Sequence, residues 1–335
     1  MGFYTDKRVL ITGGTGTIGK QLVRRILQDK PTVIRIFSRD EHKQYEMQQE
    51  LIEHNSILRY LIGDVRDVDR LTRAMEGIDY VFHLAAMKHV PACEYNPFEA
   101  VQTNVLGTQN VIQAAVNTGV KKVLFTSSDK AVSPTNTYGA TKLMAERLIS
   151  AAEYQKGAKS TIISSVRFGN VMGSRGSVIP LFKKQILKNQ RITITNPKML
   201  RYMMTPSQAI SLMLKANEMA YGGEVFVLKM PVIRLNDLTD IIIEETTNKY
   251  QITHRIQVDE IGLRPGEKKF EELMTEDEAR IALESPDMYI LMPLYGGLRQ
   301  REYVNAVHSV ELPSVGNDVI SKETLRNWLL SENLI

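Results

Sequence analysis

The sequence contains a single cysteine, Cys93, among 335 residues. One cysteine cannot form an internal disulfide, and no second thiol or ligand cluster accompanies it, so we expect a structural thiol. No run of eighteen apolar residues occurs, which argues against a membrane-spanning helix. The opening residues MGFYTDKRVLITGG lack an apolar stretch behind a basic segment. They therefore predict no secretory signal and, by default, a cytoplasmic protein.

The chain also lacks a large excess of charge of either sign. It has 42 Lys and Arg residues against 38 Asp and Glu residues, a formal net charge of +4. This small, dispersed surplus does not indicate a nucleic-acid-binding surface, but it allows a basic pocket for a small anion. The six histidines show no metal-ligand spacing, so we expect no metal site. The apolar content of 43% and charged content of 24% are ordinary for a globular chain and exclude disordered and fibrous classes.

What the sequence does contain is an alternation of short β-branched runs with longer amphipathic segments. The runs are RVLIT, TVIRIF, ILRYLIG, YVFHLAA, KKVLFTSS and STIISSVRF. Repeated strand–helix units predict an α/β fold of the Rossmann type, a doubly wound parallel sheet that binds its ligand at the carboxyl ends of the strands. Because the chain is long for one core, we expect a smaller C-terminal substrate-binding domain as well. We place the nucleotide-binding domain at 1–172, with 206–230 returning to it, and the smaller domain at 173–205 and 231–335.

The first strand leads directly into TGGTGTIG, ahead of a helix expected near Ile18. Glycines there permit a tight turn and let backbone N–H groups approach a pyrophosphate at the helix N-terminus. Two spacings fit, one using Gly14 and the other Gly13 before the same later glycines, and spacing alone does not choose between them. The candidate cofactor-binding residues of this loop are Gly13, Thr15, Gly16, Thr17, Ile18 and Gly19.

The end of the second strand bears on which dinucleotide would bind. An acid is expected there for a ribose 2′-hydroxyl, or an arginine for a 2′-phosphate. The sequence offers Ser38 and Arg39, with Lys43 about one helical turn later. A hydroxyl and two cations suit a phosphate, so NADP is favoured over NAD. The alternative is that Asp40 binds the ribose while Arg39 points into solvent.

Two later strand ends could complete the cofactor site. Asp64 and Val65 follow the third strand, where an adenine could be hydrogen-bonded and covered. Ala85 and Ala86 follow the fourth strand and are small enough to let the cofactor cross the sheet.

The stretch SSDKAVSPTNTYGATK after the fifth strand carries the candidate catalytic residues. Tyr138 and Lys142 are four residues apart in an expected helix, and an ammonium near a phenol favours the phenolate. Asp129 and Lys130 form a second acid–base pair, which suits an elimination with its two proton transfers. Lys130 can serve as a base only if its pKa is lowered. The alternative for this pair is a plain ion pair that closes the loop.

With Ser128 before them, Tyr138 and Lys142 resemble the Ser, Tyr, Lys triad of the short-chain dehydrogenase/reductase superfamily. More specifically, the chain resembles the UDP-N-acetylglucosamine 4,6-dehydratases that invert C5. The matching strings are RVLITGGTGTIG, IFSRDE, GDVRD, HLAAMKHVP, SSDKAVSPTNTYGATK, RFGNVMGSRGSVIPLF and RPGEKKFEE, spread over residues 7 to 275. Relatives that retain the C5 configuration carry Met where Tyr138 stands, so the tyrosine favours the inverting group. One departure is Leu200, where the family usually has Thr before its arginine.

The resemblance implies a reaction and a role for each candidate. Tyr138 takes the proton of the sugar 4-hydroxyl while hydride passes to NADP, and Ser128 orients that hydroxyl. Lys130 then removes the C5 proton and Asp129 protonates the departing 6-hydroxyl, before hydride returns to C6 and C5 is inverted. Lys142 also holds the nicotinamide ribose.

The UDP-sugar substrate would be bound by residues from both parts of the chain. Arginines in basic loops are candidates for the diphosphate, and the resemblance adds residues around the sugar and the uridine ribose. The full set is Lys88, His89, Asn170, Arg175, Gly176, Ser177, Val178, Arg201, Arg264 and Glu267. We also expect a homo-oligomer, a dimer or larger, formed through the helices at 98–117 and 138–154. Two rival functions remain open, a nucleotide-sugar 4-epimerase and a non-catalytic NADP-binding protein.

Overall fold

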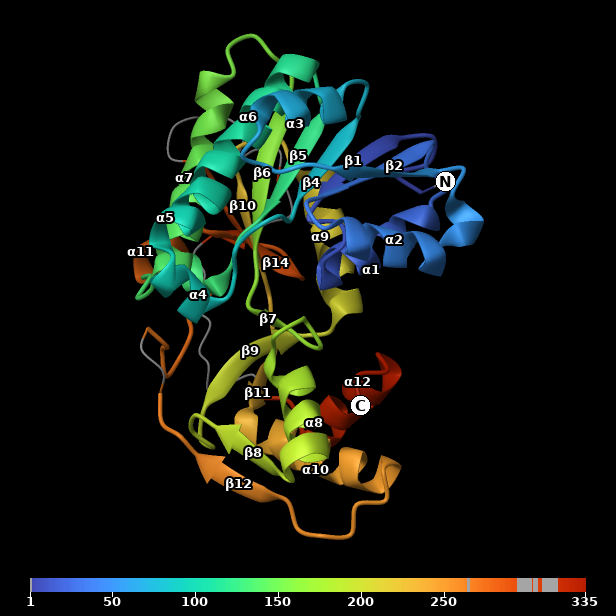
Figure 1. Ribbon diagram of the computed structural model, residues 1–335. Helices are drawn as coiled ribbons and strands as arrows, with labels where there is room; N and C mark the ends of the chain where they lie inside the picture. Colours follow the sequence, from blue (N-terminus) through green and yellow to red (C-terminus); the bar gives the residue numbers. More distant parts are fainter. Residues whose placement is uncertain (1, 264–265, 294–302, 304–306, 309–318) are drawn as a thin grey trace.

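The computed structural model describes residues 2–263, 266–293, 303, 307–308 and 319–335. Figure 1 shows a large lobe built around one sheet and a smaller lobe beneath it, which holds the C-terminus. The chain passes between the lobes more than once, because α9 (Pro206–Met219) and β10 (Val225–Leu228) pack in the large lobe after the first segment of the smaller one.

In the described residues the large lobe contains a ten-stranded sheet. Its order is β15 (Val307–His308), β13 (Leu283–Glu284), β14 (Met288–Leu291), β10, β6 (Ile162–Arg167), β5 (Lys122–Thr126), β4 (Tyr80–His83), β1 (Arg8–Thr12), β2 (Val33–Ser38) and β3 (Leu58–Ile62). Neighbours from β10 to β3 run parallel. Adjacent strands also end together, since Thr12 lies opposite both Phe37 and His83. The predicted Rossmann-type α/β class is therefore confirmed.

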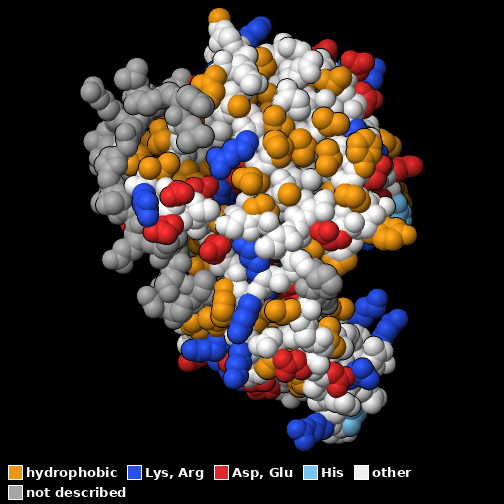
Figure 2. Space-filling model, turned by 90° about the vertical axis from the view of Figure 1, so that its left-hand side faces the viewer, with side chains coloured by type: hydrophobic (Ala, Val, Ile, Leu, Met, Phe, Trp, Pro, Cys, Tyr) orange, Lys and Arg blue, Asp and Glu red, His pale blue; other side chains and the backbone are white. Residues whose placement is uncertain are grey.

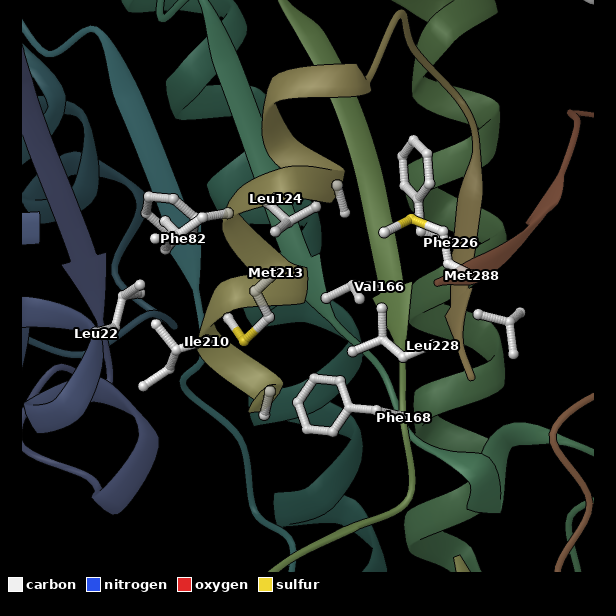
Figure 3. Packing of buried hydrophobic residues seen from close by; sticks show 14 of the residues in the cluster. Leu22, Phe82, Leu124, Val166, Phe168, Ile210, Met213, Phe226, Leu228 and Met288 are labelled. Atoms are coloured by element: carbon white, nitrogen blue, oxygen red, sulfur yellow. The ribbon is translucent and has the colours of Figure 1, made fainter. Parts of the chain in front are cut away.

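Helices cover both faces of this sheet because its side chains alternate. Ile11 packs into one hydrophobic cluster while its neighbour Leu10 packs into the cluster on the opposite face. The first face is covered by α1 (Thr17–Leu27), α2 (Glu41–Glu50) and α9, and the second by α3 (Val68–Met75), α6 (Gly107–Thr118) and α7 (Thr137–Gln155). Figure 3 shows Ile210 and Met213 of α9 packed against the side chains of the central strands. A sheet buried on both faces is the reason its strands are continuously apolar.

The smaller lobe has a hydrophobic cluster of its own, built from methionine, isoleucine and leucine side chains. Its elements are β7 (Asn170–Val171), β9 (Leu200–Met204) and β11 (Val232–Arg234) in one sheet, β8 (Arg191–Ile194) and β12 (Gln257–Glu260) in another, and α8 (Val178–Asn189), α10 (Leu235–Lys249) and α12 (Lys322–Ser331). The remaining short elements are η1 (Ile52–His54), α4 (Val90–Tyr95), α5 (Pro97–Ala100), η2 (Val101–Leu106, a π-helical turn), η3 (Asp129–Ala131) and α11 (Glu276–Ile281).

One part of the expected division of the chain differs from the structure. The sequence predicts that residues 231–335 belong to the smaller domain. In the structure, however, β14 pairs antiparallel with β10 and extends the large sheet. Met288 and Ile290 are fully buried there. A four-residue apolar strand outside the strand–helix alternation carries no sign of which sheet it joins, so the sequence could not have placed it.

Candidate active site

Three cavities meet where the carboxyl ends of the parallel strands face the smaller lobe. The first is about 910 Å³ and lies over the turn from β1 to α1, and the other two are about 300 Å³ each. Lys88 and Ser174 line all three. The cavities are therefore contiguous, and a group bound in one can reach the next.

The glycine-rich turn forms the floor of the first cavity, which every candidate residue of the loop lines. Gly13 has a φ of +69°, and a Cβ there would lie 2.8 Å from the Ala85 nitrogen. A Cβ on Gly19 would lie 2.6 Å from the Gly13 carbonyl oxygen. Because α1 begins at Thr17, right behind this turn, unbonded N–H groups at its N-terminus face the cavity. The turn fits a pyrophosphate that approaches the backbone closely.

The expected residues at the ends of β2, β3 and β4 line the same cavity. These are Ser38, Arg39, Lys43, Asp64, Val65, Ala85 and Ala86. Arg39 is the freest cation among them, with 59% of its side chain exposed and its Nη1 3.6 Å from Asp64 Oδ2. Asp40 caps α2 through the Lys43 backbone N–H and pairs with the Lys43 ammonium. This geometry disfavours the alternative in which Asp40 binds a ribose.

The carboxylate of Asp64, a candidate partner for adenine, already binds several hydrogen-bond donors of the protein. Its carboxylate accepts hydrogen bonds from the backbone N–H, Nε and Nη2 of Arg66, at 2.8 to 3.0 Å. Burial opposes ionisation, but these bonds outweigh it and lower the pKa of Asp64. An adenine amine would have to share an acceptor that already has three donors.

The five candidate catalytic residues line the third cavity together. Ser128, Asp129 and Lys130 follow the end of β5, while Tyr138 and Lys142 lie in the first turns of α7, which Asn136 caps. Lys130 Nζ is 3.1 Å from Asp129 Oδ1, and Ser128 Oγ donates to the same oxygen at 2.9 Å. A phenol, an ammonium and a carboxylate thus border one cavity.

We expected the ammonium of Lys142 to favour the phenolate form of Tyr138, but the pKa shifts of the two groups do not favour it. Burial raises the pKa of Tyr138, and its hydrogen bond with Ser128 offsets only part of that effect. Lys142 donates to the Thr126 carbonyl oxygen at 2.7 Å, and its Nζ lies 4.3 Å from the centre of the Phe125 ring. Burial lowers the pKa of Lys142 to about 7. Without a bound ligand, desolvation of both groups therefore dominates over the attraction that would favour a phenolate.

The depressed pKa of Lys142 predicts a pH-dependent cost to folding. Because the folded-state pKa lies below the ordinary value of 10.5, burying the ammonium destabilises the fold at pH 7 and below, and the cost disappears as the pH rises from about 7 toward 10.5. Lys142→Met is expected to raise the free energy of unfolding at pH 6 by a few kcal/mol, with a smaller gain at pH 9. Urea unfolding at both pH values measures this, and an equal gain at both would contradict it.

Lys130 can act as a base only if its pKa is lowered, but in the structure the pKa shifts in the opposite direction. Burial alone would lower its pKa, but the carboxylates of Asp129 and Glu271 outweigh burial and raise it. Glu271 Oε1 lies 3.4 Å from Lys130 Nζ. The lysine is therefore an ammonium at rest, whereas action as a base requires the free amine. Glu271 was not singled out from the sequence, although it lies within the matched string RPGEKKFEE, because no local pattern shows that it folds back onto Lys130.

The candidate substrate residues surround the second cavity. Lys88, His89, Asn170, Gly176, Ser177, Val178, Arg201 and Glu267 line it. Arg175 instead lines the first and third cavities, and its backbone N–H donates to Thr17 Oγ1 at 3.1 Å. Arg264 lies outside the described residues.

Arg201 is less available to a diphosphate than its charge suggested. Nη1 donates to the carbonyl oxygens of Leu200 and Lys269, and Nη2 to the carbonyl oxygen of Lys268 and to Glu267 Oε1. Four of its five N–H donors are therefore used within the protein. The guanidinium lines the cavity but mainly holds the segment that carries Glu267.

Two further polar residues support the site. The Asn104 side chain accepts from the Met87 N–H and donates to the Met87 carbonyl oxygen and to Thr141 Oγ1, which ties the loop after β4 to α7. His83, expected to be a packed strand residue, is buried between Thr12 and Thr108 at 2.7 and 3.1 Å. Burial lowers the pKa of His83 to about 3, so it stays neutral.

No group of three or more potential metal ligands occurs in the part of the chain that the structure describes. Among those same residues, no helix combines the length and the apolar character needed to cross a membrane.

Comparison with known proteins identifies the family of the chain. The model of the family described as "Polysaccharide biosynthesis protein" matches residues 9–293. A UDP-N-acetylglucosamine 4,6-dehydratase (inverting) of Campylobacter jejuni is 42% identical over 292 residues, which cover 87% of this chain and 84% of the relative. A UDP-glucose 4-epimerase of Rickettsia rickettsii is 42% identical over 290 residues, covering 85% and 83%.

The fold comparison agrees with the sequence comparison. The X-ray structure of Pen from Bacillus thuringiensis matches with a TM-score of 0.92 and 56% sequence identity, over 98% of this chain and 99% of that chain. The resemblance stated from the sequence motifs is thereby confirmed at the level of the family.

Proposed function

The chain belongs to the polysaccharide biosynthesis protein family, a group of nucleotide-sugar dehydratases and epimerases, and on that premise we propose that it is a UDP-N-acetylglucosamine 4,6-dehydratase that inverts C5. One observation carries the proposal. An acid–base pair, buried Asp129 with partly buried Lys130, lies in the same cavity as Tyr138 and Lys142. Oxidation at C4 needs only the phenol and its lysine, whereas loss of water across C5 and C6 needs a second base and a second acid.

The proton transfers up to the loss of water each have a residue of this chain assigned to them. Tyr138, as the phenolate, accepts the proton of the 4-hydroxyl as the carbonyl forms, and Lys130, as the free amine, takes the C5 proton that this carbonyl acidifies. Asp129, bonded to Lys130 Nζ, passes a proton from the newly formed Lys130 ammonium to the 6-hydroxyl, which departs as water, and Ser128 orients the reacting hydroxyl. A nicotinamide cofactor, when bound, supplies the hydride acceptor and donor at C4 and C6. Ser128, Asp129 and Tyr138 are buried, which limits the access of water to a reactive ketone.

The first cavity supports NADP as that cofactor. Its glycine turn leaves no room for side chains where a pyrophosphate would lie. Cations gather around the cavity, among them Lys20, Arg24, Arg39 and Lys43. Arg39 is the exposed cation at the end of β2, where a 2′-phosphate is read in this fold.

Arg39→Ser is expected to weaken NADP binding by about 10- to 100-fold while leaving NAD binding within about threefold, because one charge-assisted phosphate contact is lost. Titration of the protein with each reduced cofactor, followed by fluorescence, measures both affinities. Arg73→Ser, on the exposed end of α3, is the matched control. A parallel loss for both cofactors would show that Arg39 does not contact a 2′-phosphate.

The residues that line the second cavity support a UDP-sugar as the substrate. It combines apolar walls from Phe182, Met199 and Leu235 with Glu267 and the N-terminus of α8. Apolar walls can cover a pyrimidine, a carboxylate can accept from a ribose hydroxyl, and a helix N-terminus suits a diphosphate. Ser177, the first residue ahead of α8, has a buried hydroxyl with no hydrogen-bond partner, which a phosphate oxygen could supply.

A nucleotide-sugar 4-epimerase is the second candidate, favoured by the rickettsial relatives. An epimerase uses the same phenol and cofactor but has no need for the Asp129–Lys130 pair. Incubation with UDP-N-acetylglucosamine followed by base treatment separates the two, since a 4-keto-6-deoxy product then absorbs in the ultraviolet and an epimer mixture does not. If neither product forms although NADP(H) binds, a non-catalytic protein becomes the preferred reading.

The outer face of α4 to α7 supports a homodimer. It exposes apolar side chains, including Tyr95 at 88%, Phe98 at 66% and Met144 at 52%. Figure 2 faces this side of the molecule and shows hydrophobic groups spread over the larger lobe. An exposed apolar area of this kind on two paired helices suits a second copy of the chain. Phe98→Asp is expected to convert the dimer to a monomer in sedimentation velocity, and an unchanged sedimentation coefficient would rule this face out.

A further inference from the structure

Glu271 lies beside Lys130, and the proposed reaction gives this acidic residue no role. Glu271 belongs to residues 266–274, which cross from the smaller lobe onto the loop after β5 and which we call the strap. Thr135 and Asn136 donate to the Gly266 carbonyl oxygen at 3.1 and 3.0 Å, and Lys268 Nζ donates to the Val132 carbonyl oxygen at 2.9 Å. The strap is therefore bonded directly to the loop that carries the acid–base pair.

Two arginines fix the strap from the other side. Arg201 binds the carbonyl oxygens of Lys268 and Lys269, each at 2.9 Å. Arg167, which is almost wholly buried, donates to the Leu273 carbonyl oxygen at 3.0 Å and forms ion pairs with Glu146 of α7 and Glu278 of α11. Glu271 is thus held in place by bonds on both sides of it, and its approach to Lys130 is built into the fold.

Glu271 is also the less stabilised of the two carboxylates beside Lys130. Each carboxylate has one oxygen without a hydrogen-bond partner, but Asp129 Oδ1 accepts from both Ser128 and Lys130. Glu271, only 4% exposed, meets Lys130 through Oε1, and its Oε2 has no hydrogen-bond partner. A buried carboxylate with fewer donors takes up a proton more readily. Burial raises the pKa of Glu271 accordingly.

The charges in this cluster do not balance. Two buried carboxylates share one ammonium, so a net charge of −1 remains unless a carboxyl group is protonated. The other charged and titratable groups that act on the pair are Tyr138, which faces Lys130, and Arg201, which faces Glu271. Most of the donors of Arg201 are already bonded to the strap and to Leu200.

We propose that Glu271 is a positioning residue that holds Lys130 and receives the proton that its ammonium must release before the amine can act as a base. In this step one N–H bond of Lys130 breaks and an O–H bond forms on Glu271, so an ion pair becomes a neutral amine and a neutral carboxylic acid. The amine then takes the C5 proton of the sugar. The inference rests on the proposed dehydration and deepens it, because it supplies the free base that the resting ion pair lacks.

Glu271→Gln keeps the shape of the side chain and removes its ability to accept the proton. We expect the rate of water loss from UDP-N-acetylglucosamine to fall by about 100-fold or more at pH 7, with KM changed less than threefold. In the variant Lys130 must lose its proton to solvent, so the ratio of wild-type to variant rate should shrink as the pH is raised from 6 to 9. The ionisation of Tyr138 and Lys142 affects the wild type and the variant alike, so it does not change this ratio.

Glu272→Gln is the matched control, because Glu272 is the next residue of the strap, has 54% of its side chain exposed and contacts only Lys268 among the ion pairs of the described residues. It should behave like the wild type. Glu271→Asp retains a carboxyl group and should recover part of the rate. If Glu271→Gln does not fold, as judged by thermal melting, Glu271→Asp carries the test through its own pH profile.

The possible results distinguish the proposed dehydratase function from the proposed role of Glu271. A wild-type protein that releases no water from the substrate overturns the proposed function. A wild-type protein that releases water while Glu271→Gln matches it, or is slower by the same factor at every pH, overturns the role of Glu271 alone. A ratio that falls steadily as the pH rises supports the proton transfer.

Discussion

Lys130→Ala is expected to lower the rate of water loss by about 10²- to 10⁴-fold, the usual contribution of a positioned general base, while oxidation at C4 still occurs. The reason lies in the geometry. Lys130 Nζ forms ion pairs with Asp129 and Glu271, whereas Lys142 donates separately to the Thr126 carbonyl oxygen at the end of β5. Formation of reduced cofactor after mixing with substrate reports the oxidation, and mass spectrometry of the sugar reports the water loss.

Lys269→Ala provides the control for this experiment, since it removes an exposed lysine of the strap without touching the acid–base pair. Removing Lys130 also leaves two buried carboxylates without their cation, so the melting temperature should drop as well. A variant that is still folded and loses oxidation and dehydration equally would contradict the separate role of Lys130. Full activity would contradict the assignment altogether.

Tyr138→Phe is expected to stop both reactions, because the phenol oxygen of Tyr138 is the atom to which we assign the proton of the 4-hydroxyl, and water loss follows only after C4 is oxidised. The phenol ring packs against Cys93 and Ala100, and the phenylalanine keeps that packing. The folded state should therefore survive, and the loss should appear in kcat by about 10²-fold or more rather than in stability. Reduced cofactor and water loss, measured as for Lys130, should both be absent.

The control here is Tyr45→Phe, on the exposed face of α2, which should leave both steps unchanged. Oxidation that persists in Tyr138→Phe would show that another group removes the 4-hydroxyl proton. Water loss that persists would mean that C4 is never oxidised in the course of the reaction.

The sequence predicted those features of the fold that repeat or that are local. Alternating strands and helices led to the doubly wound sheet, and the glycine turn was placed correctly at the end of β1 because both signals lie within a few residues. The SDK and YGATK strings predicted residues that do line one cavity, since a strand end and the following helix start are close in any fold of this type.

Features that depend on distant contacts could not be predicted. Glu271 lies 141 positions after Lys130 along the chain, and only the strap brings them together. The donors of Arg201 are occupied by backbone carbonyl groups, which no side-chain pattern reveals. Burial, which decides the pKa values of Tyr138 and Lys142, is likewise a property of the packed structure. The cytoplasmic location, the choice of NADP and the homo-oligomer remain predictions.

If one site oxidises C4 and then removes water across C5 and C6, both events leave a mark on the same product. Mass spectrometry of UDP-N-acetylglucosamine incubated with the protein and NADP in heavy water detects this mark. We expect a product that has lost one water and gained one deuterium at C5. A product with the mass of the substrate, or one that has lost water without deuterium at C5, would contradict it.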